Sequence, residues 1–234
     1  MNTQNHNHQL PFAARCIIGL FGLAGLAAVI GAIAYQPAFA SGRIFLLLAA
    51  GALSARLKVN LYKGTTLSFL TAVVLFAVVK EGPAAAILIA ICGVTIQTIR
   101  PERKVVLHQL VFNAGMVALT TAGTWWTHHM LTATHAVNAI SVETLSTILA
   151  SFAYFLGNSL SVSLIVAVTK GISLFHVWSQ HILYSAPSFM IGGLVSLGVI
   201  ALINTGDPGL SASFTAVLAF VYYCSVRLTQ QRTA

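Results

Sequence analysis

The chain has 234 residues, of which 57% are hydrophobic and only 7% are charged, and its formal net charge is +8. A soluble domain has about 25% charged residues, so this composition excludes an ordinary water-soluble fold and predicts a single membrane domain. The positive charge does not predict nucleic-acid binding, because the basic residues are dispersed at the ends of apolar runs, where Lys and Arg face anionic lipid.

The apolar runs predict an all-α membrane protein, built as a polytopic helical bundle. A spanning helix needs about 20 apolar residues. Eight candidate hydrophobic segments occur, at residues 13–35, 44–57, 65–79, 83–99, 106–127, 142–168, 187–204 and 211–228. The second, third and fourth are short, so we expect six to eight crossings, with six if two short segments pair as a re-entrant hairpin. We assign residues 13–229 to one transmembrane domain, between polar tails at 1–12 and 230–234.

The first segment has two further features. It is followed at residues 36–41 by QPAFAS, which resembles a signal-peptide cleavage site. The apolar run is long for a signal peptide, and cleavage would leave an odd number of crossings, so we expect an uncleaved helix and keep cleavage as the alternative. Ala24, Ala28 and Ala32 recur at four-residue spacing, which favours close packing against another helix.

The charges also predict the orientation. If the C-terminus with Arg227 and Arg232 is cytoplasmic, eight crossings leave only Arg43 and Lys80 of the 12 basic residues outside. This positive-inside bias predicts an even number of crossings with both termini in the cytoplasm.

Residues 172–184 differ from the other segments. Phe175, Trp178 and Ile182 share one helical face there, which predicts an amphipathic helix on the cytoplasmic membrane surface. The alternative is that these residues are the first turns of the next spanning helix.

The predicted helix interiors lack the groups that catalysis needs. The chain has no H-E-x-x-H, no G-x-S-x-G and no phosphate-binding glycine loop. No segment carries paired carboxylates, and Glu143 near the outer end of the sixth segment has no evident partner. We therefore predict no enzyme, no catalytic residue and no cofactor, and the same absences argue against a proton-coupled pump.

The fifth and sixth segments carry neutral polar side chains instead. Asn113 and Thr120 lie in the fifth, and Tyr154 and Asn158 lie in the sixth. Polar groups in lipid are unfavourable without partners. Polarity alone favours interhelical hydrogen bonds, which contribute about 0.6 kcal/mol each on average. The alternative is a small pocket for a neutral or weakly charged ligand, and these four residues are its candidate ligand-binding residues.

Histidines and tryptophans follow the fifth segment in what we expect to be an outer loop. Trp125, Trp126, His128 and His129 are followed by His135, and imidazoles at this spacing could hold Zn or Cu. The spacing is not a recognised zinc pattern, so we favour an interfacial Trp belt with solvated histidines and predict no metal site. A pH response through these histidines is a further alternative.

Much of the chain resembles two related membrane families. The stretches that carry the resemblance are 65–69 (TTLSF), 82–86 (GPAAA), 100–104 (RPERK), 110–113 (LVFN), 154–159 (YFLGNS), 172–178 (ISLFHVW) and the last helix ending at Arg227. They are similar to the S components of energy-coupling-factor vitamin transporters. They are closer to the vitamin-uptake-like sensor domain that precedes output domains in bacteria. The likeness extends over about residues 44–227.

The resemblance implies an S-component-like bundle in a bacterial inner membrane, with a ligand pocket between helices that includes Asn113 and Asn158. In such sensors the last helix runs into an output domain. The chain stops shortly after Arg227, so we expect a sensor module without its effector or a protein that acts with a separate partner. We expect a sensory or ligand-binding module, and the alternative is an S-component-like or permease-type transporter of a vitamin-like solute. Its expected partners are the lipid bilayer, an unidentified small ligand and a cytoplasmic output domain or protein.

Overall fold

The computed structural model describes residues 10–36, 42–56, 58–60, 66–99, 106–133 and 139–206. Helices form most of this part of the chain. They are α1 (Phe12–Tyr35), α2 (Gly42–Arg56), α3 (Leu70–Lys80), α4 (Pro83–Thr98), α5 (Leu107–Ala133), α6 (Ala139–Lys170), α7 (Leu174–Val177) and α8 (Ala186–Thr205). The expected segment 211–228, the tail 230–234 and residues 37–41 of the cleavage-like motif lie outside the described residues.

The bounds of α1, α2, α4, α6 and α8 confirm the corresponding apolar segments to within a few residues. Local sequence explains two of these bounds. Pro83 occupies the first turn of α4, where its missing N–H leaves no bond unmade, and Gly82 precedes it with φ of 87°. Helix α8 ends at Thr205, and the next residue, Gly206, has the left-handed backbone that commonly ends a helix.

The third expected segment, 65–79, is wrong at its start. Strand β1 (Lys58–Asn60) pairs antiparallel with β2 (Thr66–Ser68), and helix α3 begins only at Leu70. A short run rich in Thr, Leu and Phe suits a strand as well as a helix, so hydropathy alone does not separate the two. The remaining α3 has 11 residues. It is therefore about 16 Å long, well short of the roughly 30 Å hydrocarbon core.

Helix α5 continues to Ala133, beyond the expected end of the fifth segment at residue 127. The stretch expected as an outer loop is helical. Its threonine hydroxyls bond inside the helix, because Thr127 donates to the carbonyl of Gly123 and Thr132 donates to the carbonyl of His128. Such bonding satisfies these hydroxyls without a partner helix.

The stretch 172–184 becomes helical at Leu174 and forms a composite helix from there. After α7 come a π-helical turn (Trp178–Ile182) and a 3-10 turn (Leu183–Ser185), and α8 follows without a non-helical residue between them. Val177 is buried, whereas Phe175 is 69% exposed. The continuous helix from Leu174 into α8 agrees with the alternative from the sequence, in which these residues are the first turns of the next long helix. Their position at a membrane surface stays a prediction.

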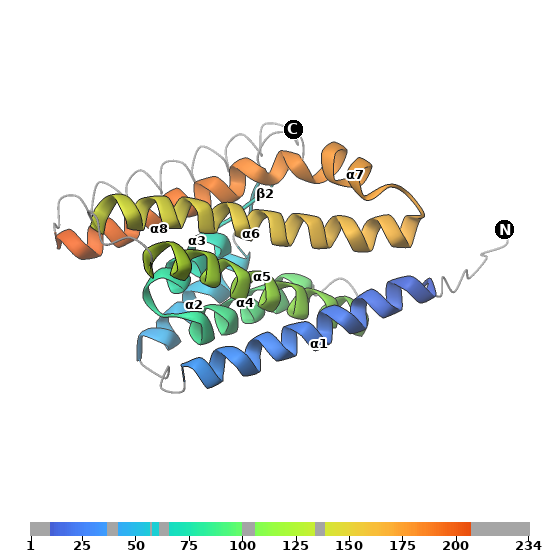
Figure 1. Cartoon of the computed structure of the whole chain (residues 1–234), viewed down its shortest axis with the longest axis horizontal. Helices are drawn as coiled ribbons and strands as arrows, with labels where there is room; N and C mark the ends of the chain where they lie inside the picture. Colours follow the sequence, from blue (N-terminus) through green and yellow to red (C-terminus); the bar gives the residue numbers. More distant parts are fainter. Residues whose placement is uncertain are drawn as a thin grey trace.

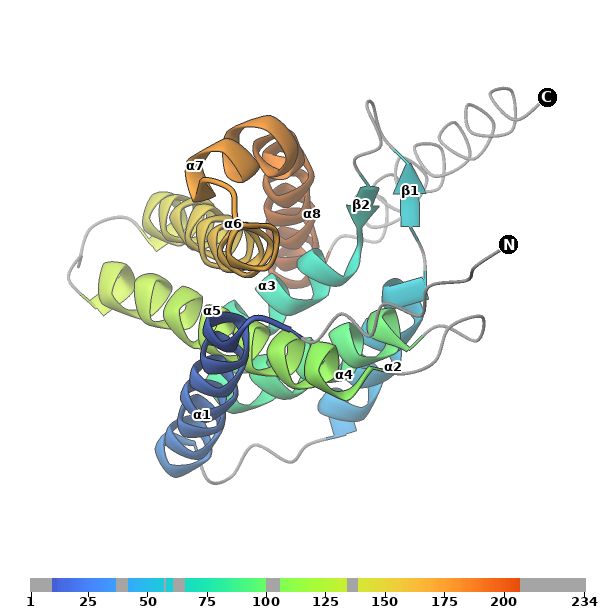
Figure 2. The same cartoon turned by 90° about the vertical axis from the view of Figure 1, so that its right-hand side faces the viewer.

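The helices form two layers. Figures 1 and 2 show α6, α7 and α8 in one layer and α1, α4 and α5 in the other, with α3 between them. Helix α5 packs on α1, α4 and α6, and α2 packs on the outer side of α4. The main hydrophobic cluster lies where α3, α4, α5 and α6 meet, and it includes Leu70, Val74, Leu75, Val78, Ile89, Val117 and Tyr154.

Three helical stretches in the described part are long and apolar enough to cross a membrane. They are Phe12–Tyr35, Val142–Lys170 and Leu174–Thr205, while Leu70–Lys80 and Pro83–Thr98 are apolar but shorter. On α1, Leu20, Leu23 and Ile30 are 60–71% exposed. Such a surface is compatible with lipid, because lipid tails are as apolar as leucine. A helical bundle with membrane-compatible helices is thus confirmed.

Candidate functional site

The predicted pocket residues Thr120 and Tyr154 both lie at the interface of α5 and α6. Thr120 lies against Gly157 of α6, where an added Cβ would be 2.8 Å from the Thr120 methyl carbon and 3.0 Å from its hydroxyl oxygen. Thr120 is only 8% exposed. The backbone of α6 at Gly157 therefore packs directly against the Thr120 side chain of α5, an approach that small residues permit in membrane bundles.

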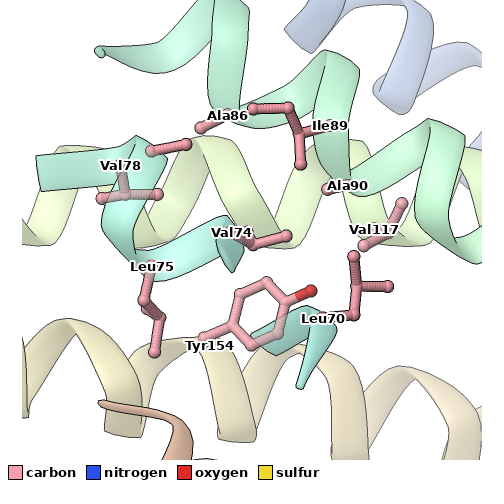
Figure 3. Close-up of a cluster of buried hydrophobic side chains, with 10 residues drawn as sticks. Leu70, Val74, Leu75, Val78, Ala86, Ile89, Ala90, Val117 and Tyr154 are labelled. Carbon is pink, nitrogen blue, oxygen red and sulfur yellow. The ribbon is translucent and has the colours of Figure 1, made fainter. Parts of the chain in front are cut away.

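Tyr154 belongs to the main hydrophobic cluster and is 4% exposed. Figure 3 shows its ring among aliphatic side chains, with the hydroxyl on the side of Val117. That hydroxyl shares a hydrogen bond with the Thr121 side chain. Tyr154 therefore joins α6 to α5, since a buried tyrosine hydroxyl generally needs a partner.

Asn113 makes the interhelical bond that the structural alternative expected. Its Nδ2 donates to Thr98 Oγ1 over 3.0 Å, and the Thr98 hydroxyl donates to the carbonyl of Val94 over 2.8 Å. Asn113 thus ties the start of α5 to the end of α4. It points to α4 rather than to α6, so the structure does not bring it together with Asn158.

Asn158 differs from the other three candidate residues. It is half-buried in the middle of α6. Within the described part of the chain, it forms no hydrogen bond, ion pair or ring contact with another residue. It lies one turn beyond Tyr154 on the same side of the helix. Its amide is therefore the one among the four candidates that has no partner within the described part of the chain.

The hydroxyls that surround these residues bond within their own helices. Each donates to the carbonyl four residues earlier, at 2.7–2.8 Å. The residues are Thr121, Thr124, Thr147, Ser151 and Ser163. Back-bonding of this kind satisfies Ser and Thr without a cross-helix partner. These hydroxyls therefore suit packing better than ligand recognition.

A contact that hydropathy did not reveal joins α6 to the π-helical turn. The indole Nε1 of Trp178 donates to Ser159 Oγ over 3.1 Å, and Ser159 is 1% exposed. Ser159 directly follows Asn158 in the chain. This bond therefore joins the residue next to Asn158 to a π-helical turn, an element that occurs frequently at functional sites.

An ion pair joins α3 to α6 at the other end of the bundle. Lys80 Nζ lies 2.9 Å from Glu143 Oε1, and both side chains are about one-third exposed. The expectation that Glu143 lacks a partner is therefore wrong. Hydropathy could not pair residues this far apart in sequence, although the charge count did put both on the outer side.

His128 is buried close to this ion pair, so the expectation of solvated histidines is wrong for it. It is 8% exposed, and its Nε2 has no hydrogen-bond partner among the described residues. Burial is the largest influence and lowers its pKa from the usual 6.5. The Glu143 carboxylate raises the pKa, and His129 and Lys80 lower it.

His129 occupies a different environment from its neighbour. Its ring stacks on Trp125 at 4.9 Å, and Tyr35 of α1 meets the same indole edge-on at 4.9 Å. His135 lies outside the described residues. Among the residues that the structure describes, no three His, Cys, Asp or Glu side chains gather as metal ligands would.

Comparisons with known proteins add no relative. No protein family, curated protein or solved structure matches the chain. We therefore infer the function from the geometry of the described residues.

Proposed function

We propose that this chain is a non-enzymatic module of a bacterial inner membrane, which binds a small ligand within its helical bundle and signals binding to the cytoplasm. The observation that carries the proposal is the amide of Asn158, which is half-buried and has no partner in the described part of the chain. Neighbouring hydroxyls bond their own helices, and Asn113 is engaged by Thr98. An amide both donates and accepts hydrogen bonds, so it suits a neutral or weakly charged polar ligand.

The signal would leave the pocket through Trp178. A ligand on Asn158 displaces or locks the middle of α6, and the next residue, Ser159, accepts the Trp178 hydrogen bond. The π-helical turn at Trp178 leads directly into α8. Signalling requires that the ligand bind one packing arrangement more tightly than the other. The receiver in this scheme is a cytoplasmic output domain or a separate protein.

The proposed topology has six to eight crossings and both termini in the cytoplasm. Its support is the arrangement of the charged helix ends. The Lys80–Glu143 pair joins the C-terminal end of α3 to the N-terminal end of α6. The ring contact between Tyr35 and Trp125 joins the C-terminal end of α1 to the C-terminal part of α5. At the opposite end, the first turns of α1 and α5 pack with the last turns of α6, close to Arg15 and Lys170. Basic residues at this end favour the cytoplasmic side.

Ligand-induced thermal stabilisation tests the pocket. The full chain in detergent is melted with and without each member of a panel of water-soluble vitamins. A ligand at 100 times its Kd stabilises by about 2.7 kcal/mol, which corresponds to about 5–10 °C for a chain of this size. Asn158→Ala should abolish this shift. Ser161→Ala is the matched control on α6, because the Ser161 hydroxyl bonds the carbonyl of its own helix, and it should keep the shift.

Asn113→Ala separates binding from packing. It should lower the melting temperature without ligand, because the bond from Asn113 to Thr98 between α5 and α4 is lost, and it should keep the ligand shift. Equal ligand shifts in Asn158→Ala and wild type, or no shift with any vitamin, would contradict the proposal. Uptake of the stabilising vitamin into vesicles that contain the protein and an energising ATPase would favour the transport alternative instead.

A further inference from the structure

The outer end of the bundle brings ionisable side chains together around a buried imidazole. His128 comes from the last turns of α5, beyond the apolar part of that helix, and its Nε2 is unpartnered among the described residues. Among the described residues, the charged and titratable groups that act on this imidazole are Glu143 of α6, Lys80 of α3 and His129 of α5, and Glu81 and Tyr35 lie next to them. The first turn of α4 has none.

We propose that His128 is a proton-binding site that couples acidity outside the membrane to the contact between α3 and α6. The side of the membrane follows from the proposed topology. Proton binding itself is independent of the ligand pocket at Asn158. At neutral pH the imidazole is uncharged and Lys80 holds Glu143 across the two helices.

Protonation sets up a competition for one carboxylate. The imidazole takes a proton from water at Nε2 and becomes a buried cation, which is unfavourable without an anion. Glu143 is the anion that acts on His128, and Lys80 already holds it at 2.9 Å. The carboxylate therefore turns from Lys80 towards His128, which loosens the tie between α3 and α6.

The direction of the pH effect follows from burial. Burial lowers the pKa of His128 below 6.5 in the folded protein, so the unfolded chain binds the proton more readily between the two pKa values. Stability is therefore complete above about pH 6.5 and falls as the pH drops through the folded-state pKa.

The first experiment compares melting temperatures of the full chain in detergent at about pH 8 and about pH 5, on either side of the histidine range. Each pKa unit lost on folding changes the unfolding equilibrium tenfold, which is about 3–5 °C for this chain length. Wild type should melt at a lower temperature at the acid pH than at the alkaline pH, and this loss should be much smaller in His128→Gln. His108→Gln is the matched control and should keep the wild-type loss, because His108 is exposed in the first turn of α5, at the opposite end of that helix.

A second experiment tests the proposal even if His128→Gln fails to fold, because it does not use that variant. Histidine NMR titrations of wild type, Lys80→Gln and Glu143→Gln follow the histidine that titrates below the others. Glu143→Gln should move its midpoint to lower pH, and Lys80→Gln should move it to higher pH, since these groups act on the pKa of His128 in opposite directions. Opposite shifts support the proposal. Unmoved midpoints, or equal acid losses in His128→Gln and wild type, would overturn it.

Discussion

The crossing of α1 over α5 leaves no space for a side chain at two glycines. A Cβ added to Gly25 would lie 2.6 Å from the carbonyl oxygen of Gly115, and one added to Gly115 would lie 2.7 Å from the carbonyl carbon of Phe21. Ordinary Cβ contacts begin at 3.4 Å. Gly25→Ala therefore forces the helices apart by at least about 0.8 Å, the difference between 3.4 and 2.6 Å. Backbone atoms cannot rotate away, so the whole of α1 must move.

Two other glycines are matched controls. Nothing lies within 4 Å of a Cβ at Gly31 on α1 or at Gly123 on α5. Alanine there gains up to about 1 kcal/mol of helix propensity without a clash. Overpacking at Gly25 or Gly115 should remove about 1–3 kcal/mol relative to these controls. Melting temperatures in detergent should thus differ by about 3–10 °C within each pair.

A second readout locates the change. Tyr35 meets Trp125 edge-on at the end of α1, so a displaced α1 should alter the tryptophan fluorescence of Gly25→Ala and leave that of Gly31→Ala unchanged. If Gly25→Ala melts together with Gly31→Ala, and Gly115→Ala with Gly123→Ala, the close crossing does not exist as described.

Further predictions concern the contacts of α6. Gly157→Ala should lower the melting temperature by about 2–6 °C through overpacking, and Thr120→Ser, which removes the clashing methyl, should restore most of it in the double variant. Tyr154→Phe should lose about 1 kcal/mol, measured by thermal melting, because one hydrogen bond to Thr121 disappears; no loss would argue against that bond. Trp178→Phe should speed amide hydrogen exchange in the π-helical turn and leave α1 unchanged, and protection equal to wild type would refute the anchoring of that turn on α6.

The sequence predicted the long helices well because the residues that start or end a helix lie at the ends of the apolar runs. The run that forms α1 ends at a polar Gln36, and α4 begins at Pro83 after a glycine. Elsewhere the local signal was ambiguous. Strand β2 lies in an apolar run that also suits a helix, and the polar end of α5 resembles a loop until its hydroxyls find carbonyls inside the helix.

The candidate site was predictable only as a set of polar residues. Composition identified Asn113 and Asn158 alike, yet one bonds Thr98 and the other has no partner among the described residues. Which amide is engaged depends on how neighbouring helices are rotated, and residue type carries no information on that. The same holds for Lys80 and Glu143, which only the packing of α3 near α6 brings together.

The self-contained hydroxyls of α5 and α6 have a mechanical consequence. A helix whose Ser and Thr hydroxyls bond its own carbonyls forms few hydrogen bonds to its neighbour through those side chains. Small rotations or translations of α6 would then break few directional contacts, and the barrier to such sliding would be low. Apart from the Glu143 pair at the start of α6, the exceptions are Tyr154 near its middle and Ser159 about one turn further on, since each shares a hydrogen bond with another helix. They would act as the pivots about which α6 turns.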